Sequence, residues 1–327
     1  MSGQVAKPKI YIDYISYFKA SGLPISLGKS DDNVNEDYSD LFTYNPSNTK
    51  TFTAISEDNG GADSDLTRLD FTVWLGDGTG EPRKLVQSIN WGAFLNHNIY
   101  SLDLNWRNIS ALKENGGIDT LSGSYIYGGA RNNFNLQSLD TTKWNDTNCY
   151  GVVFTVNLNS WTIPLTLGAC MAGRTFSFPH NANLSMNIDY NAEGIKKKRT
   201  LGGRDIVDIN YYKQPDWNGQ PPFVATEVSS NNLSTTSHIG RRSWALTFSF
   251  LTANDTFPQS MDHNFMFDNS YTEGQETSWT NWGTENITSH FMTLTMNGQL
   301  PFIFQPDDTK DTYAMCRLRS NSFSVQQ

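Results

Sequence analysis

The stretch Ser243-Trp-Ala-Leu-Thr-Phe-Ser-Phe-Leu251 alternates large apolar side chains with small or polar ones. Successive side chains of a β-strand point to opposite faces of the sheet. Trp244, Leu246, Phe248 and Phe250 would therefore share one face of such a strand. This alternation is typical of an antiparallel strand with one buried face. The stretch makes an all-β fold the first expectation.

The rest of the chain repeats this β-type composition in short runs, which are separated by Gly, Asn, Asp and Ser. The runs are rich in β-branched and aromatic residues, as strands of a sandwich or barrel are. No long segment carries an apolar stripe of helical period. We therefore expect little helix, at most one or two turns between residues 103 and 114. The predicted strands are residues 10–18, 51–55, 69–75, 88–95, 151–158, 163–167, 174–178 and 184–190.

Two further strands are predicted near the end of the chain, at residues 291–296 and 300–304. Asn297-Gly298 lies between them and suits a type I′ hairpin turn, which needs positive φ at both positions. The run at 300–304 is apolar and uncharged, so it has to be covered within its own domain or by another protein. We favour partial cover by a neighbouring protein. Phe302 and Phe304 then become candidate partner contacts.

A polar, proline-bearing connector follows the apolar strand near residue 178 and predicts a domain boundary. The length of 327 residues is about twice that of a common domain. The expected division is a β-sandwich at residues 1–183 and a second β-rich domain at 184–327. The basic stretch Lys196-Lys-Lys-Arg199 is expected to form a turn in the second domain.

Composition and charge exclude several classes of partner. Lys and Arg total 24 and Asp and Glu total 33, so the net charge of −9 argues against direct nucleic-acid binding. The apolar run that starts at Ile10 is short and contains Asp13, unlike a signal peptide or a membrane span. We expect a soluble chain made in the cytoplasm, without a membrane partner.

No motif points to catalysis, a cofactor or a metal. Cys149, Cys170 and Cys316 are widely spaced and odd in number, so buried free thiols are expected rather than disulfides or a zinc site. The glycine-rich residues 76–80 lack the Lys-Ser/Thr of a phosphate-binding loop and predict a turn. The sequence predicts a protein that is not an enzyme. Pairs of loop carboxylates leave polysaccharide cleavage as the least favoured alternative.

Three residues remain as candidate ligand contacts. Trp279 and Trp282 lie in a polar stretch, where their rings could stack on sugars or on a protein, or could equally anchor a long loop. His97 follows an apolar strand between two Asn residues. It could donate to a ligand at the mouth of a sandwich, although a role in holding the turn at the strand end is favoured.

Several stretches together resemble structural proteins of tailed bacteriophages, particularly marine and cyanobacterial phages. The resemblance covers about residues 88–325, and its most specific part is Leu-Pro-Phe-Ile-Phe-Gln-Pro-Asp at 300–307 after a strand that begins Gly240-Arg-Arg-Ser-Trp. The other stretches are Asn96-His-Asn98, residues 166–184 and Arg199-Thr-Leu-Gly-Gly203.

The resemblance implies that the first half is similar to a galactose-binding, discoidin-like jelly roll, and that the second half is a β-domain of the virion tail. It predicts a structural component of the tail or baseplate, located in the virion, that forms homo-oligomers and contacts other tail proteins. The alternative is a carbohydrate-binding module of a tail fibre, which would attach the particle to a cell-surface glycan.

Overall fold

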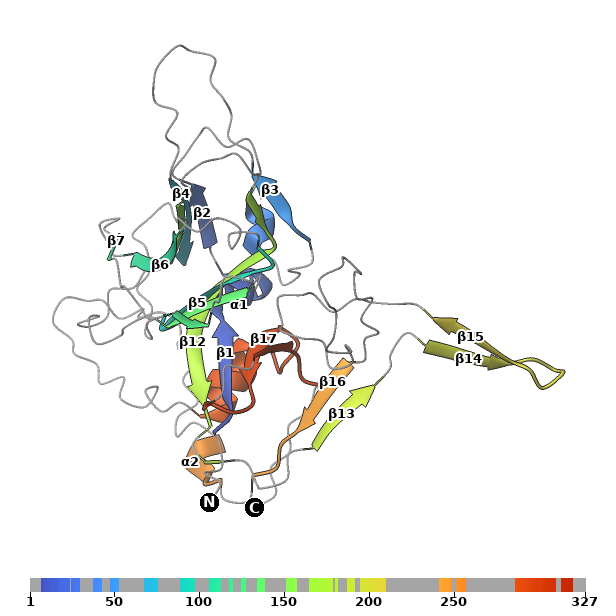
Figure 1. Ribbon diagram of the computed structural model, residues 1–327. Helices are drawn as coiled ribbons and strands as arrows, with labels where there is room; N and C mark the ends of the chain where they lie inside the picture. Colours follow the sequence, from blue (N-terminus) through green and yellow to red (C-terminus); the bar gives the residue numbers. More distant parts are fainter. Residues whose placement is uncertain are drawn as a thin grey trace, which may run out of the picture.

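The computed structural model is shown in Figure 1. It describes residues 7–23, 25–29, 38–42, 48–52, 68–75, 89–97, 106–112, 118–119, 125–127, 134–138, 151–157, 165–178, 180–181, 187–191, 195–209, 241–248, 251–256, 286–309 and 313–319.

The described part of the chain is rich in β-strands, and each strand pair is antiparallel. Two large sheets and three two-stranded sheets are present among these residues. The predicted all-β class agrees with this architecture.

The larger sheet has seven strands and draws on both ends of the chain. Its order is β18, β17, β1, β12, β5, β9, β8. β1 pairs with β12 on one side and with β17 on the other, so strands far apart in the sequence are neighbours. The strands are β1 (Lys9–Asp13), β5 (Trp91–Leu95), β8 (Tyr125–Tyr127), β9 (Phe134–Ser138), β12 (Ala169–Ser177), β17 (Phe302–Gln305) and β18 (Ala314–Cys316).

In the seven-stranded sheet, β1, β5 and β17 are buried on both faces. In β1, Ile10 and Ile12 belong to the main core, whereas Tyr11 belongs to a second apolar cluster that includes Trp91. The Tyr11 hydroxyl donates a 2.8 Å hydrogen bond to Oε1 of Gln305, and its ring meets Trp91 edge-on at 5.6 Å. Burial on both faces explains why these strands are continuously apolar in sequence instead of alternating.

The second large sheet has five strands in the order β2, β4, β10, β6, β7. β10 pairs over its full length with β4 and with β6. This sheet confirms the strands predicted at residues 69–75 and 151–158. The strands are β2 (Ile25–Lys29), β4 (Arg68–Leu75), β6 (Trp106–Leu112), β7 (Ile118–Asp119) and β10 (Gly151–Asn157).

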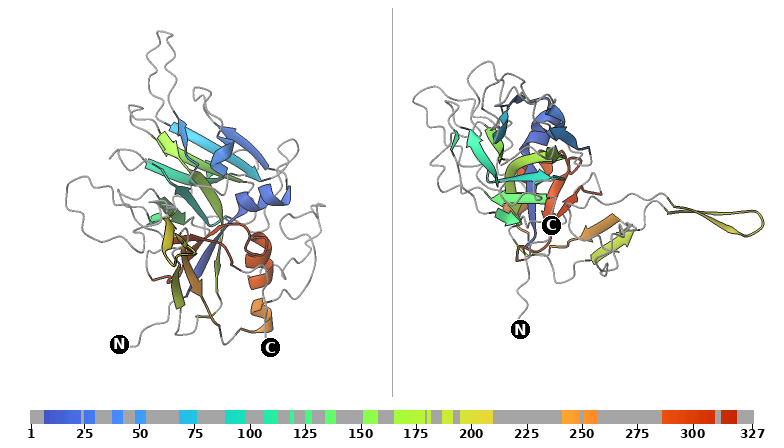
Figure 2. Two further views of the ribbon diagram at one scale, coloured as in Figure 1. Left: turned by 90° about the vertical axis from the view of Figure 1, so that its right-hand side faces the viewer. Right: turned by 45° about the horizontal axis from the view of Figure 1, so that its top comes forward.

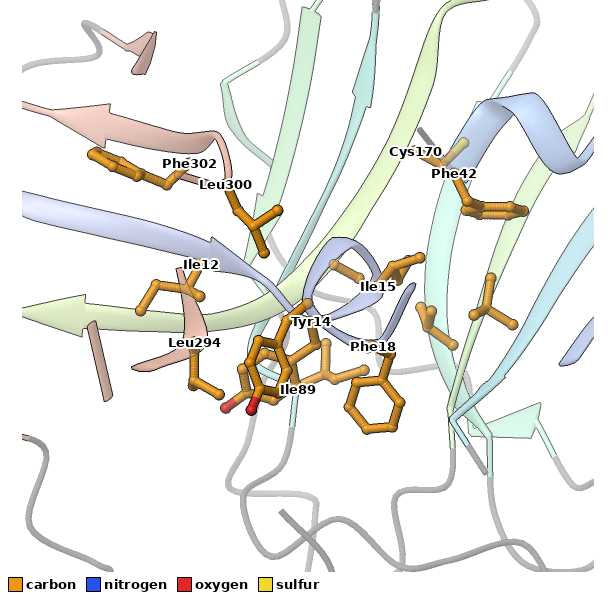
Figure 3. Close-up of a cluster of buried hydrophobic side chains, with 14 of the residues drawn as sticks. Ile12, Tyr14, Ile15, Phe18, Phe42, Ile89, Cys170, Leu294, Leu300 and Phe302 are labelled. Atoms are coloured by element: carbon orange, nitrogen blue, oxygen red, sulfur yellow. The ribbon is translucent and has the colours of Figure 1, made fainter. Parts of the chain in front are cut away.

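Side chains of the two large sheets meet in one core. Phe94 of β5 and Phe154 of β10 lie edge to face, with ring centroids 5.5 Å apart. Both rings are fully buried and belong to the same apolar cluster. Figure 3 shows that this cluster also joins the N-terminal Ile12 and Phe18 to Leu294 and Phe302 from near the C-terminus.

The first predicted strand, residues 10–18, is only half correct. β1 ends at Asp13, and the helix α1 (Tyr14–Ser21) follows directly. The Asp13 side chain caps the helix by accepting hydrogen bonds from the backbone N–H groups of Ile15 and Ser16, at 3.3 and 3.0 Å. Gly22 ends the helix at φ +68°. The sequence does not show the change from strand to helix at Asp13, because the residues of both elements are apolar and buried.

The prediction of a short helix between residues 103 and 114 is wrong. Residues Trp106–Leu112 form β6, which pairs with β10. The run Trp-Arg-Asn-Ile-Ser-Ala-Leu mixes helix formers and strand formers, and its pairing with a central strand decides the conformation.

The predicted hairpin around Asn297-Gly298 is also wrong. The π-helical segment η5 (Ile287–Met292) replaces the first predicted strand and continues as helical turns to Gln299. Ile287, Phe291 and Leu294 are all buried, so the apolar positions have helical spacing. Asn297 and Gly298 do have positive φ, 55° and 75°, but they end this helical segment instead of joining two strands.

The second predicted strand of that hairpin is present as β17, which is not an exposed edge. β17 lies between β1 and β18. Phe302 and Phe304 are 4% and 5% exposed, and Trp244 lies edge-on to Phe304 with centroids 5.6 Å apart. The chain itself covers the segment, which corrects the expectation that a neighbouring protein does so.

The predicted boundary at residue 183 does not separate the two ends of the chain. β17 and β18 belong to the same sheet as β1 and β12. Between them, residues 187–209 and 241–245 contribute two small sheets. The remaining elements are β3 (Lys50–Phe52) with β11 (Leu165–Leu167), β13 (Asn187–Asn191) with β16 (Arg241–Ala245), β14 (Ile195–Arg199) with β15 (Asp205–Ile209), η1 (Ser39–Phe42) and α2 (Ala253–Thr256).

The alternation in the stretch from Ser243 is confirmed in part. Trp244, Leu246 and Phe248 pack partly buried against the main core, while Ala245 and Thr247 are exposed. Strand pairing ends at Ala245, and residues 246–248 belong to no strand.

Candidate functional site

The hairpin of β14 and β15, residues 195–209, is the part of the described chain that stands out as a candidate interaction site. We call it the hairpin arm. In Figures 1 and 2 it extends away from the two large sheets. Its strands pair in register from Ile195 opposite Ile209 to Arg199 opposite Asp205. The basic stretch that the sequence places in a turn is therefore a strand, and the turn follows it.

A network of hydrogen bonds orders the tip of the hairpin arm. The backbone N–H of Thr200 donates to the carbonyl of Arg204 at 2.8 Å, and the Thr200 hydroxyl accepts from the Arg204 N–H at 3.0 Å. The Gly203 N–H donates to the Thr200 carbonyl at 2.9 Å. Gly203 has φ +80°, the left-handed conformation that closes a three-residue hairpin loop and suits glycine.

The described side chains of the hairpin arm face solvent almost without exception. Residues 197–199 and 201–207 are exposed, and only Thr200 is half-buried, within its own turn. Leu201 at the tip is fully exposed, and Ile206 and Val207 are 54% and 45% exposed. These three are the exposed large apolar side chains of the described residues.

The hairpin arm is basic in an acidic chain. It contains five Lys and Arg and two Asp, a net charge of +3, so the other residues of the chain sum to −12. Arg199 Nε and the Asp205 carboxylate are 4.0 Å apart and both exposed, a pair that contributes little to stability. A basic ribbon with an apolar tip is suited to bind an acidic protein surface with apolar patches.

Of the predicted contact residues, His97 is described and buried. It follows β5 and Asn96, which has φ +53°, and it is 2% exposed. Its ring lies edge-on to Phe94 at 6.4 Å. This burial places His97 inside the fold and away from an external ligand.

Two other predicted contacts, Phe302 and Phe304, are also buried. Phe302 and Phe304 are core residues of β17. Trp279 and Trp282, on which the glycan-binding alternative depends, lie outside the described residues. No described feature therefore favours sugar binding.

The buried Asp13 carboxylate and Cys170 thiol form a structural contact. Burial raises the pKa of Asp13 to about 6, against hydrogen bonds from the Ser16 hydroxyl and from three backbone N–H groups, including that of Ala172 in β12 at 3.1 Å. Burial also raises the pKa of the Cys170 thiol, and the nearby Asp13 carboxylate adds to this rise. A thiol that stays protonated is not a nucleophile.

The cysteines and the acidic groups provide no other site in the described ranges. Cys170 is a buried free thiol, as predicted, and Cys316 is half-buried; Cys149 lies outside the described residues. Within these ranges no three His, Cys, Asp or Glu side chains gather so that they could hold a metal ion. The described helices include none long and apolar enough to cross a membrane.

Comparison of the chain with protein-family models, curated proteins and solved structures found no match.

The sequence prediction of a turn at residues 196–199 misses the hairpin arm. The turn lies at Leu201-Gly-Gly203, after the basic stretch. Two β-type runs of equal length on either side of a Gly-Gly pair are the usual sign of a hairpin.

Proposed function

We propose that the chain is a structural component of a tailed-phage virion, in the tail or baseplate, that assembles through protein–protein contacts. The phage setting rests on the resemblance of residues 88–325. The assembly role rests on one observation, the exposed and ordered hairpin arm.

The physical argument concerns stability. A two-stranded ribbon exposed on both faces is marginally stable in water. Neither β14 nor β15 has a second pairing strand among the described residues, so the outer edges of the arm offer backbone N–H and C=O groups with which another chain can pair. The arm's exposed apolar side chains add to the gain when a partner covers it. A protein that acts through many contacts in an assembly accounts for such an element.

We further propose that the two large sheets form a jelly-roll-like β-sandwich. The contact between Phe94 and Phe154 and the shared core support this arrangement. The C-terminal strands β17 and β18 then complete the sandwich together with the first half of the chain.

The test is to locate the chain in particles. Antibodies raised against the purified chain should label the tails of gradient-purified virions in immunogold electron microscopy. Mass spectrometry of the same particles should detect it in amounts comparable to those of other tail proteins. A non-structural protein of the same phage is the negative control. Absence of the chain from infectious particles would contradict the proposal.

A further inference from the structure

We propose that the hairpin arm binds a second copy of this chain, with Leu201 buried in the contact and the basic side chains of β14 facing carboxylates of that copy. The inference rests on the proposed assembly function and specifies its partner. It is argued from the shape, the charge and the exposed side chains of the arm.

The faces of the hairpin arm show how a partner would have to cover it. Residues directly opposite each other in an antiparallel pair lie on the same face. Lys197 with Val207 therefore lies on one face, and Lys198 with Ile206 lies on the other. Each face carries basic residues and one exposed apolar residue. Covering only one face would leave an apolar side chain in water, so the arm fits a partner that surrounds it.

The tip is ordered before it binds. Four of its hydrogen bonds involve Thr200. The Thr200 hydroxyl donates to the Arg204 carbonyl and accepts from the Arg204 N–H. The Thr200 N–H also donates to the Arg204 carbonyl, and the Thr200 carbonyl accepts from the Gly203 N–H. This network holds Leu201 on a fixed loop, and the Leu201 side chain is fully exposed in the part of the chain that the structure describes. A side chain fixed in advance loses less conformational entropy on binding, and Leu201 is thus suited to fill a pocket.

Charge identifies the partner. The arm carries +3 and the remainder of the chain −12, so the rest of another copy has the opposite net charge to the arm. Nucleic acid is the other polyanion that a lysine-rich ribbon could bind. The two Asp of β15, which lie opposite Lys196 and Arg199 in the register, disfavour it, and the exposed Leu201, Ile206 and Val207 serve a protein surface.

The first experiment measures self-association of the full chain by sedimentation velocity over a range of concentrations and salt. We expect concentration-dependent oligomers that weaken in 0.5 M NaCl, since charge pairs are screened. Leu201→Ser should lower the association constant about tenfold or more, as expected for losing one buried leucine contact. Lys19→Ser, at the exposed end of α1, is the control and should leave association unchanged.

The second experiment identifies the partner. The photo-crosslinking residue benzoylphenylalanine is placed at position 201, and the labelled chain is mixed with an isotopically heavy copy. Crosslinks from position 201 to heavy peptides are expected. Crosslinks within one copy alone would overturn the proposal, and so would a wild-type chain that is monomeric at every concentration.

Two further outcomes separate this inference from its alternatives. If Leu201→Ser lowers the melting temperature of the monomer, the side chain packs within its own chain and the proposal fails. Tight, salt-sensitive binding of a fluorescent DNA duplex that replaces self-association would also overturn it. If the chain self-associates through the arm but is absent from virions, the proposed function fails while this inference stands.

Discussion

His290 is a buried imidazole in a helical segment of a β-rich protein. It is 3% exposed and stacks on Phe176 at 5.9 Å, and its Nε2 has no hydrogen-bond partner among the described residues. Burial lowers the pKa of His290 to about 3, and the charge of Arg174 adds to the shift. Protonation of this side chain is therefore much less favourable in the folded state than in the unfolded state.

The sign of the resulting pH dependence follows from the pKa. Between about pH 6.5 and pH 3 the unfolded state binds more protons at this residue, so the free energy of unfolding falls as the pH falls. His290→Phe should keep the stacking and remove this slope. We expect urea midpoints of the variant to decrease less than those of the wild type between pH 7 and pH 4. Parallel curves for the two proteins would contradict the assignment.

The contribution of Asp13 to the free energy of unfolding has the opposite pH dependence. Because burial raises its pKa to about 6 from 3.8, the folded state binds more protons between these values, and this stabilising contribution is lost as the pH rises from 3.8 to 6. Asp13→Ala removes the helix cap and the acceptor of the buried Ala172 N–H. It should lower the free energy of unfolding by about 2–4 kcal/mol, more at pH 4 than at pH 7.

Denaturant titrations of Asp13→Ala at both pH values check this prediction. Asp40→Ala is the control, because Asp40 forms a partly exposed ion pair with Lys50 at 2.9 Å. Its loss should cost less than about 1 kcal/mol. Equal costs for the two variants would show that the Asp13 cap does not hold β1 and α1 together.

At the scale of elements, short apolar runs are the places where sequence and structure diverge. Residues 69–75 and 151–158 were predicted as strands and are strands, since they are β-branched and pair at the centre of a sheet. Residues 14–18 and 291–296 are apolar but helical. Their burial is nearly complete, so neither a period of two nor one of 3.6 is visible over five or six residues.

The end of the helical segment gives a prediction at this scale. Gly298 has φ +75°, and a Cβ built on it would lie 2.3 Å from Cγ of Leu318. Gly298→Ala should destabilise the chain by at least about 1–2 kcal/mol from the backbone conformation alone, with the steric contact adding to it. Thermal melting of the variant checks this value. Gly202→Ala is the matched control, because nothing lies within 4 Å of its Cβ position and its φ is not positive.

At the scale of the whole molecule, the sequence predicts the class of the fold but not its long-range pairings. Alternation and turn residues are local signals, so strands could be predicted from them. The pairing of β1 with β17 joins residues about 300 positions apart, and no local pattern specifies it. The candidate site was likewise hidden, because exposure of Leu201 depends on where the hairpin arm points.

That long-range pairing supplies the last prediction. The sequence-based division at residue 183 would make residues 1–183 an independent domain. In the structure, Ile10 and Ile12 of β1 share a core with Leu294, Leu300 and Phe302, and β17 covers one edge of β1. A fragment of residues 1–183 would lose this cover and expose both the apolar cluster and the edge of β1. We expect this fragment to aggregate or to lack a cooperative thermal transition. The control is the full chain with residues 200–204 replaced by Asn-Gly, which should melt like the wild type. A soluble fragment with a sharp transition and dispersed amide resonances would instead establish two separate domains.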